Sequence, residues 1–436
     1  MKYIIKEYGI ELFSIVLVYA SIFLNILPVI PVVLCFISLS LYRSGLLGAF
    51  VLSSYALPVV LGSTLYAIGI TGVATIIQVL LFFICIYHWR VSKKFSIHNF
   101  TKAISPLIYI YILLVISSLI TSGGNYAFIK CKDTIVNGIL VFFSFALIFS
   151  NSEKCDCRRI GLYLILYSFL MLLLSPLLNK GSGPADLFDF GYLRRNNMSV
   201  VEDELFTIDY QHVGTFATLG CAMIMLQTLW AKVNNKLIII GIILSTLSSL
   251  YSGARQSMII SVTLILLWSI FQERNKKSTI LYACIGVSVV IMLVEFLFAE
   301  GGMLNSVKED GYLEASNRDL VLLKGVTDFL DNPFFGVGYG RFFFGKYGLY
   351  PHNLIVELLC ELGLIGVLII FSLSLKPIIQ IIKNYKPCAY LLVVYILRSM
   401  TSGGMDSNIM LFGFISSTIC IYSMINNSNK QNNNAY

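Results

Sequence analysis

The sequence predicts an all-α polytopic membrane protein, and three observations carry that prediction. Of its 436 residues, 57% are hydrophobic and only 12% are charged, and the mean hydropathy is +0.81. Apolar runs long enough for a bilayer-crossing helix, which takes about 20 residues, recur along the chain. The first run leads directly into a second without a cleavage site of small residues, so we expect no signal peptide. An ordinary soluble globule is excluded.

The apolar runs divide into about fourteen expected transmembrane helices. We expect these helices to form a single integral membrane domain over residues 1–436. In chain order the expected spans are 10–24, 26–42, 46–67, 70–89, 104–122, 134–150, 160–178, 212–230, 237–251, 257–271, 279–298, 352–375, 388–402 and 409–425.

Basic clusters between the spans predict the orientation. With a cytoplasmic N-terminus, the densest clusters all face the cytoplasm: 90–94, 153–159, 232–236, 273–277 and 383–386. This is the bias that the positive-inside rule describes. The formal net charge of +8 therefore indicates topology, and we expect a lipid bilayer rather than a nucleic acid as partner. The predicted location is the bacterial inner membrane.

Two long segments fall on the outer, periplasmic side of this topology: 179–211 and 299–351. Long loops that are not linkers usually carry function. The second contains "EASNRDLVLLKGVTDFLDNP", which predicts a short amphipathic helix with Ser316 as N-cap and an end before Pro333. One apolar face of this loop helix is formed by Leu320, Leu323, Val326 and Leu330. At the end of the chain, we expect the tail, 426–436, to be disordered in the cytoplasm.

A glycine-rich stretch, "FFGVGYGRFFFGKYG", follows the loop helix. Gly336, Gly338 and Gly340 allow a tight backbone path among aromatic side chains. The aromatic residues 342–344, Tyr347 and Tyr350 either stack on sugar rings or seat the loop at the membrane interface, and the interface is the better expectation.

Three arginines stand near the outer ends of spans or in the outer loop, where positive charge is not favoured. Arg255 either binds an anion or extends to the headgroups and pairs with Glu295 or Glu300. Arg318 opens the loop helix and by itself is more typical of a solvated charge. For Arg398, a salt bridge to Asp406 is as good an interpretation as a ligand role. We expect no metal site, because the Cys155 and Cys157 pair lacks further ligands.

His352 is one of only four histidines and lies at the mouth of an apolar helix, in "LYPHNLIVELLCELGLIG". Pro351 restricts the approach of the chain, and Asn353 stands beside the histidine. A helix N-terminus disfavours an imidazolium, so the ring is expected to be neutral and able to accept a proton. A neutral base beside arginines suits attack by a hydroxyl on a carbon that bears a phosphate leaving group.

Several motifs, in order, resemble the O-antigen ligase and polymerase superfamily. They are "SGAR" at 252–255, "NR" at 317–318, "NPFFGVGYG" at 332–340, "PHN" at 351–353 and "ELGLIG" at 361–366. The resemblance covers about residues 252–375 in motifs and the remainder only in the many-span layout.

The resemblance implies a metal-independent glycosyltransferase without a cofactor, acting on undecaprenyl-diphosphate-linked oligosaccharides with its active site on the periplasmic side. By the same resemblance His352 activates the acceptor hydroxyl, and Arg255 and Arg318 bind the donor diphosphate. Other residues have supporting roles, namely Asn353, Arg398, Gly338 and Gly340. A flippase and a chain-length regulator of the same pathway are the protein partners to expect.

The motifs leave three functions open. The leading hypothesis is a polymerase that transfers a growing glycan to a lipid-linked repeat unit. The first alternative is a ligase that transfers the finished glycan to lipid A–core. A flippase for the lipid-linked glycan is less favoured, because the outer loop is large and no inverted repeat is evident.

Overall fold

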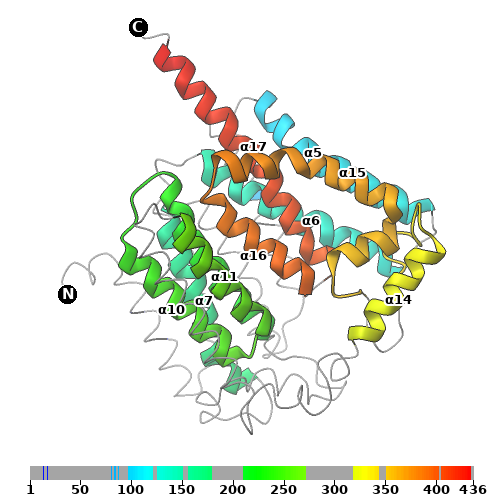
Figure 1. Cartoon of the computed structure of the whole chain (residues 1–436), viewed down its shortest axis with the longest axis horizontal. Coiled ribbons are helices and arrows are strands. Elements are labelled where there is room, and N and C mark those ends of the chain that lie inside the picture. The colour runs from blue at the N-terminus through cyan, green and yellow to red at the C-terminus, as the bar shows by residue number, and fades with distance from the viewer. Residues whose placement is uncertain are drawn as a thin grey trace. The chain divides into compact units, whose positions relative to one another are not determined.

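The computed structural model describes residues 97–120, 125–150, 156–178, 210–271, 318–342, 350–401 and 404–433, with a few isolated positions before residue 97. In this part of the chain every regular element is a helix (Figure 1). The expected spans at 10–24, 26–42, 46–67, 70–89 and 279–298 lie outside the described residues, as does nearly all of the outer segment 179–211.

Five described helices are long and apolar enough to cross a membrane, which supports a multi-pass membrane protein. Shorter apolar helices accompany them, and the total of about fourteen spans stays a prediction. The five are Phe100–Ile120, Tyr126–Phe149, Tyr210–Leu229, Asn235–Ser252 and Leu354–Asn384.

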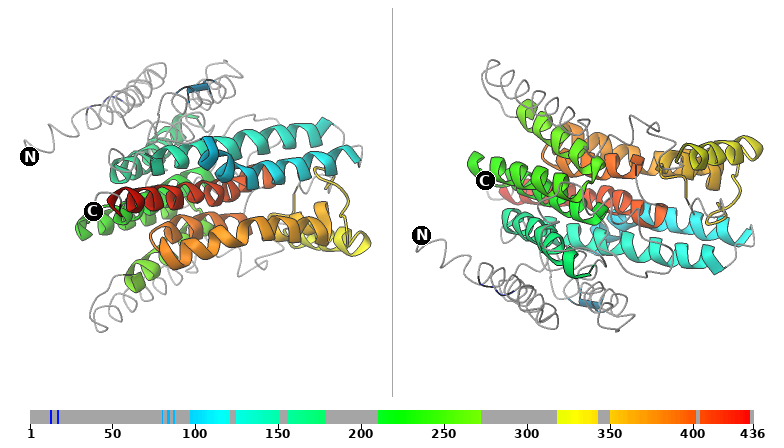
Figure 2. Two further views of the ribbon diagram at one scale, coloured as in Figure 1. Left: turned by 90° about the horizontal axis from the view of Figure 1, so that it is seen from above. Right: turned by 90° about the horizontal axis from the view of Figure 1, so that it is seen from below.

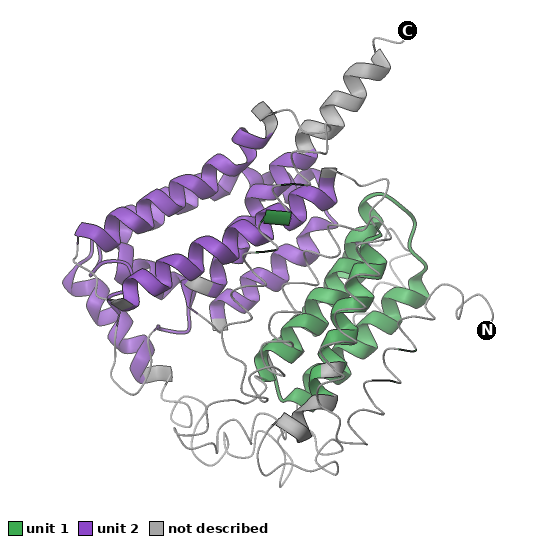
Figure 3. Ribbon diagram, turned by 180° about the vertical axis from the view of Figure 1, so that it is seen from behind, with its two compact units in different colours: residues 1–88, 151–270 green, residues 89–150, 271–436 purple. Residues whose placement is uncertain are grey.

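The chain divides into two compact units, which Figure 3 shows in different colours. Unit 1 comprises residues 1–88 and 151–270, and unit 2 comprises residues 89–150 and 271–436. Each unit is described by itself, so the single membrane domain expected over 1–436 stays a prediction.

Unit 1 contains α7 (Cys157–Leu178), α9 (Tyr210–Leu226), α10 (Asn235–Ser252) and α11 (Arg255–Phe271), whose last residue belongs to unit 2. Small residues bring these helices close together. A Cβ atom added to Gly161 of α7 would lie 2.3 Å from the carbonyl oxygen of Gly220 of α9. The two backbones are therefore in direct contact.

Unit 2 contains the remaining described α-helices: α5 (Ile97–Ile120), α6 (Asn125–Ser150), α14 (Arg318–Asp331), α15 (Leu354–Asn384), α16 (Cys388–Thr401) and α17 (Met405–Asn433). Both views of Figure 2 show the long helices of this unit running side by side, with α14 at one end. The contact of α17 with α6 is close, since a Cβ on Gly413 would lie 2.6 Å from the Gly138 carbonyl oxygen.

Several helix ends in unit 2 differ from the predicted spans: α5 begins at Ile97 rather than at 104, α15 ends at Asn384 rather than at 375, and two further differences concern α6 and α17. Helix α6 begins at Asn125 rather than at 134, because Lys130, a charge that hydropathy excludes from a span, is buried against carboxylates inside the unit. Helix α17 runs to Asn433 and so continues into the tail for which disorder is predicted.

Five helix ends gather at one end of unit 2, which we call the His352 pole. There α5 and α16 end and α6, α15 and α17 begin, as the contacts of Ser117, Lys130, Glu357, Met400 and Met405 described below demonstrate. These alternating chain directions are those of the predicted topology. That the pole faces the periplasm stays a prediction.

Helix α14 packs against α15 at this pole (Figure 1). It spans the region predicted to be helical and ends before Pro333, as expected. Its packed side is Val321, 1% exposed, and Gly325, which approaches Pro351 and Val356. The apolar face predicted from the sequence is instead the more exposed side of the helix: Leu320, Leu323, Val326 and Leu330.

Candidate functional site

The His352 corner, residues 351–353, turns the chain into helix α15. Asn353 is the N-cap, and its Oδ1 accepts hydrogen bonds from the backbone N–H groups of Ile355 at 3.0 Å and Val356 at 3.2 Å. Its Nδ2 donates to the carbonyl oxygen of Met400, at the end of α16, at 3.2 Å. Asn353 therefore both starts one helix and ties it to the next.

His352 lies directly before the cap, so the helix begins at Leu354 rather than at the histidine itself. Its backbone adopts a left-handed conformation with φ of 57°, uncommon for a residue with a side chain. The ring of Tyr350 lies edge-on to the imidazole at 4.6 Å between centroids. Such a conformation costs about 1–3 kcal/mol and persists only where surrounding contacts hold it. The contacts around the His352 corner therefore stabilise its backbone conformation.

Helix α15 is broken at Gly363, and the glycine loop, residues 332–342, completes its hydrogen bonds. The carbonyl oxygens of Cys360 and Glu361 accept from the loop N–H groups of Val337 at 2.7 Å and Gly338 at 3.0 Å. In return, the N–H groups of Leu364 and Ile365 donate to the carbonyl oxygens of residues 333 and 334, at 2.8 and 3.2 Å. Backbone polar groups buried in a membrane protein need such partners.

Glycines make these hydrogen bonds possible, because they let the backbone of the loop approach the backbone of α15 closely. A Cβ on Gly336 would lie 2.4 Å from the carbonyl carbon of Glu361, and one on Gly363 would lie 2.3 Å from the carbonyl carbon of Phe334. Both residues also have positive φ, 70° and 65°. The motifs "NPFFGVGYG" and "ELGLIG" are therefore the two sides of one contact.

Side chains of α5 and α6 fix the far end of the glycine loop. The hydroxyl of Tyr339 lies 2.5 Å from that of Thr134, and the Tyr339 N–H donates to Ser117 Oγ at 3.0 Å. Burial raises the pKa of the Tyr339 phenol well above its ordinary value, so the group stays protonated. Gly340 lies against Ala127, whose Cα would be 2.6 Å from an added Cβ. The predicted tight path of the loop is confirmed.

Phe342 is 1% exposed and packs with Val321 and Cys360. It is thus a core residue, and the predicted interfacial position is wrong for it, because the loop folds back onto α15. Residues 343, 344 and 347 lie outside the described part of the chain.

A buried triad of ionisable residues lies beneath the loop. Lys130 Nζ is 2.6 Å from Glu357 Oε1, and 2.7 and 2.8 Å from Glu361 Oε1 and Oε2. The three side chains are at most 1% exposed. The same ammonium lies 4.9 Å from the centroid of the Tyr339 ring.

The sequence interpretation missed this triad. Glu357 and Glu361 are four residues apart in an apolar helix and therefore share a face. Lys130 is likewise a charge at the edge of an apolar run. Ionisable residues within membrane helices pair with one another, so the spacing was a usable signal.

The structure positions the helices that carry two of the predicted arginines. Arg318 is the first residue of α14, which packs against α15 in the same unit as His352. Arg255 is the first residue of α11 in unit 1, directly after a turn at Gly253 with φ of 75°. Both side chains lie outside the described atoms.

Arg398 lies near the end of α16 and is 9% exposed. Its Nη1 is 3.7 Å from Met410 Sδ. The side chain of Asp406, its predicted salt-bridge partner, lies outside the described atoms. Helix α16, which carries Arg398, ends beside the His352 corner, because the Met400 carbonyl oxygen accepts the hydrogen bond from Asn353.

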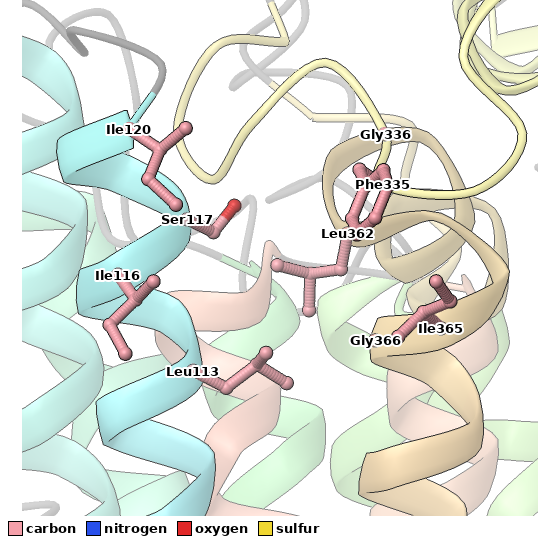
Figure 4. Close-up of a pocket in the computed structure, with 9 residues that line it drawn as sticks. All are labelled: Leu113, Ile116, Ser117, Ile120, Phe335, Gly336, Leu362, Ile365 and Gly366. Atoms are coloured by element: carbon pink, nitrogen blue, oxygen red, sulfur yellow. The ribbon is translucent and has the colours of Figure 1, made fainter.

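A cavity of about 260 Å³ opens between α5 and the broken part of α15 (Figure 4). Leu362 extends from α15 toward α5, and Ser117 is the residue with a hydroxyl group that lines the cavity. The other lining residues are apolar or glycine: Leu113, Ile116, Ile120, Phe335, Gly336, Ile365 and Gly366.

The described helices thus define a multi-pass helical membrane protein with a polar corner at one pole of unit 2. Residues 240–371 match the family model of the O-antigen ligases. The matched segment includes Arg255, Arg318, the glycine loop and the His352 corner, although it is less than half of the chain. It confirms the resemblance to the O-antigen ligase and polymerase superfamily and supports an enzyme role. Among curated proteins, none matches the chain.

Proposed function

We propose that the protein is a surface-polysaccharide polymerase. It transfers a growing glycan from undecaprenyl diphosphate to a lipid-linked repeat unit at the outer face of the bacterial inner membrane. The observation that carries the proposed glycosyl transfer is the His352 corner, held at the entry of a membrane helix inside the matched segment 240–371. The choice of a polymerase over a ligase rests on "GVGYG" at 336–340, which resembles the polymerase branch of the superfamily.

In the proposed reaction a hydroxyl at the non-reducing end of the acceptor attacks the anomeric carbon of the donor glycan. A new carbon–oxygen bond forms there while the bond from that carbon to the diphosphate breaks. The bonding electrons leave with undecaprenyl diphosphate. The proton of the hydroxyl passes to the imidazole of His352, which acts as general base.

Arg255 and Arg318 are proposed to bind the diphosphate. Their guanidinium groups present forked N–H donors that suit phosphate oxygens. The charge that develops on the leaving group is greatest in the transition state, so fixed cations there accelerate transfer. Two arginines supply this stabilisation without a metal ion or a cofactor.

A ligase is the second candidate, and the family description, O-antigen ligase, favours it. It would use the same base and the same diphosphate site but a lipid A–core acceptor. The expected pathway partners, a flippase and a chain-length regulator, go with the polymerase proposal.

The surface glycan of a deletion strain distinguishes these functions. A polymerase predicts core that carries a single repeat unit. Bare core together with long lipid-linked chains would show a ligase. Repeat units retained on the cytoplasmic side would show a flippase and would overturn the proposal of a transferase.

A further inference from the structure

The buried triad lies where four parts of unit 2 meet. Its lysine belongs to α6 and its two carboxylates to α15. Glu357 Oε1 accepts a hydrogen bond at 2.9 Å from the N–H of Met405, where α17 begins. Glu361 accepts from the backbone N–H groups of Gly340 and Phe342 in the glycine loop. Three helices and the loop therefore converge on these three side chains.

Stability alone does not account for such a group. Burying charges costs desolvation free energy, and an apolar cluster of similar volume is often as stable or more so. One ammonium here faces two carboxylates, and Glu357 Oε2 is buried without a hydrogen-bond partner among the described residues. What a buried ionic network supplies is a preference for one geometry over others.

The triad is connected to the His352 corner through the first turn of α15. The N–H of Glu357 donates to the carbonyl oxygen of Asn353 at 2.9 Å. The carbonyl oxygen of Glu361 accepts from Gly338 of the loop at 3.0 Å. A displacement of α6 against α15 would therefore move both the corner and the loop.

We propose that Lys130, Glu357 and Glu361 are positioning residues for His352. They hold α6, the start of α15 and the glycine loop in one register, so that the imidazole stays in place relative to the membrane helices. Lys130 lies outside the matched segment 240–371, and the proposal adds α6 to the site. The inference rests on the proposed role of His352 as the base.

The decisive variant is Glu361→Gln, which is nearly isosteric and leaves a neutral Lys130–Glu357 pair. The full-length protein in lipid nanodiscs is assayed with undecaprenyl-diphosphate-linked repeat units. A positioning role predicts that kcat falls about tenfold while KM changes little, because a misplaced base affects the transition state most. Asp133→Asn, which changes a carboxyl group that is 41% exposed, is the matched control and should leave both constants unchanged.

Lys130→Met removes the ammonium and leaves two buried carboxylates, so lower protein levels are expected beside a loss of activity of about 100-fold. The triple variant Lys130→Met/Glu357→Gln/Glu361→Gln removes all three charges and keeps oxygen acceptors for the backbone N–H groups. It should restore the protein level but not kcat. Recovery of wild-type kcat in the triple variant would overturn the positioning role and leave charge balance as the only function.

A readout independent of the reaction is the alkylation of Cys360 by N-ethylmaleimide, resolved by mass spectrometry. Its thiol is fully buried between α14 and the loop, so loosening of the loop should raise its labelling rate in Glu361→Gln. An unchanged labelling rate together with wild-type kcat would overturn the proposal.

His352→Ala, assayed in parallel, separates the two proposals. If it is inactive while Glu361→Gln keeps wild-type kcat, the positioning role is overturned and the proposed function stands. If His352→Ala keeps wild-type activity, the base assignment and the positioning role built on it both fail. Cys360 labelling then still reports whether the triad holds the loop.

Discussion

The two units hold their helices together by different means. Among the described residues of unit 1, neutral groups join the helices: glycines face backbone, Ser168 and Ser248 hydroxyls lie 2.5 Å apart, and those of Ser245 and Ser261 lie 3.0 Å apart. In unit 2 the His352 pole is held by a buried ammonium, two carboxylates and a loop that completes a broken helix.

This difference between the units indicates a role for the buried charges of Lys130, Glu357 and Glu361. Small residues and hydroxyl groups are sufficient for helix association in membranes, and unit 1 uses them. The more costly ionic contacts occur beside the corner that carries the proposed base. Small residues and hydroxyl groups are thus enough to bring helices together in both units, whereas the contacts that fix one geometry lie at the His352 pole.

The largest expected effect is that of His352→Ala. Loss of a general base should lower glycan transfer about 100- to 10,000-fold, measured as chain length in cells and as kcat in nanodiscs, at a normal membrane level. His212→Ala in α9 of unit 1 is the matched control and should retain activity. Normal glycan length in the His352→Ala variant would show that His352, in unit 2, is not the general base.

Gly363→Ala should be the most destabilising small substitution at the pole. Its Cβ would meet the carbonyl carbon and oxygen of Phe334, both at 2.3 Å, at a positive φ. A loss of about 3 kcal/mol or more is expected and is measured by thermal unfolding in detergent. Gly241→Ala in unit 1 meets only the tip of Ile224 at 3.0 Å, so its stability should change by about 1 kcal/mol at most. Equal effects would contradict the contrast between the units.

Arg255→Lys should reduce transfer about 10- to 100-fold, because lysine keeps the charge but loses bidentate contact with a phosphate. The measurement is kcat/KM for the lipid-linked donor. Arg158→Lys, in a surface ion pair with Asp156 in the same unit, should have no effect. Full activity of the Arg255 variant would favour an arginine that extends to the headgroups.

Ser248→Ala should have the smallest effect. Ser168 keeps the carbonyl oxygen of Val213 as an acceptor at 2.8 Å, so the loss should be about 0.6 kcal/mol in detergent unfolding. A loss several times larger would mean that hydroxyl contacts fix the geometry of unit 1 as strongly as the triad fixes that of unit 2.

Hydropathy and turn chemistry predicted much of unit 2. The apolar runs placed α5, α15 and α16, the amphipathic pattern placed α14, and three glycines predicted a tight loop, in which each of them has a positive φ. These features are local, because a helix or a turn depends on residues only a few positions apart.

The partners across the unit were not predictable in the same way. The four-residue spacing of Glu357 and Glu361, which we did not interpret, puts them on one face, but their cation, Lys130, is more than 200 residues away in the chain. Likewise, a pattern of apolar residues on α14 did not say which side would meet α15, and the packed side runs through Val321 instead. Such pairings depend on which helices meet, and one sequence does not contain that information in its spacing.

The break at Gly363 has a consequence for how this region can be changed. Four backbone hydrogen bonds join residues 333–338 to residues 360–365, and none of them depends on a side chain. What the contact does require is a glycine on each side, Gly336 in the loop and Gly363 in the helix, so a chimera that imports a relative's outer loop should fold only if both glycines are kept.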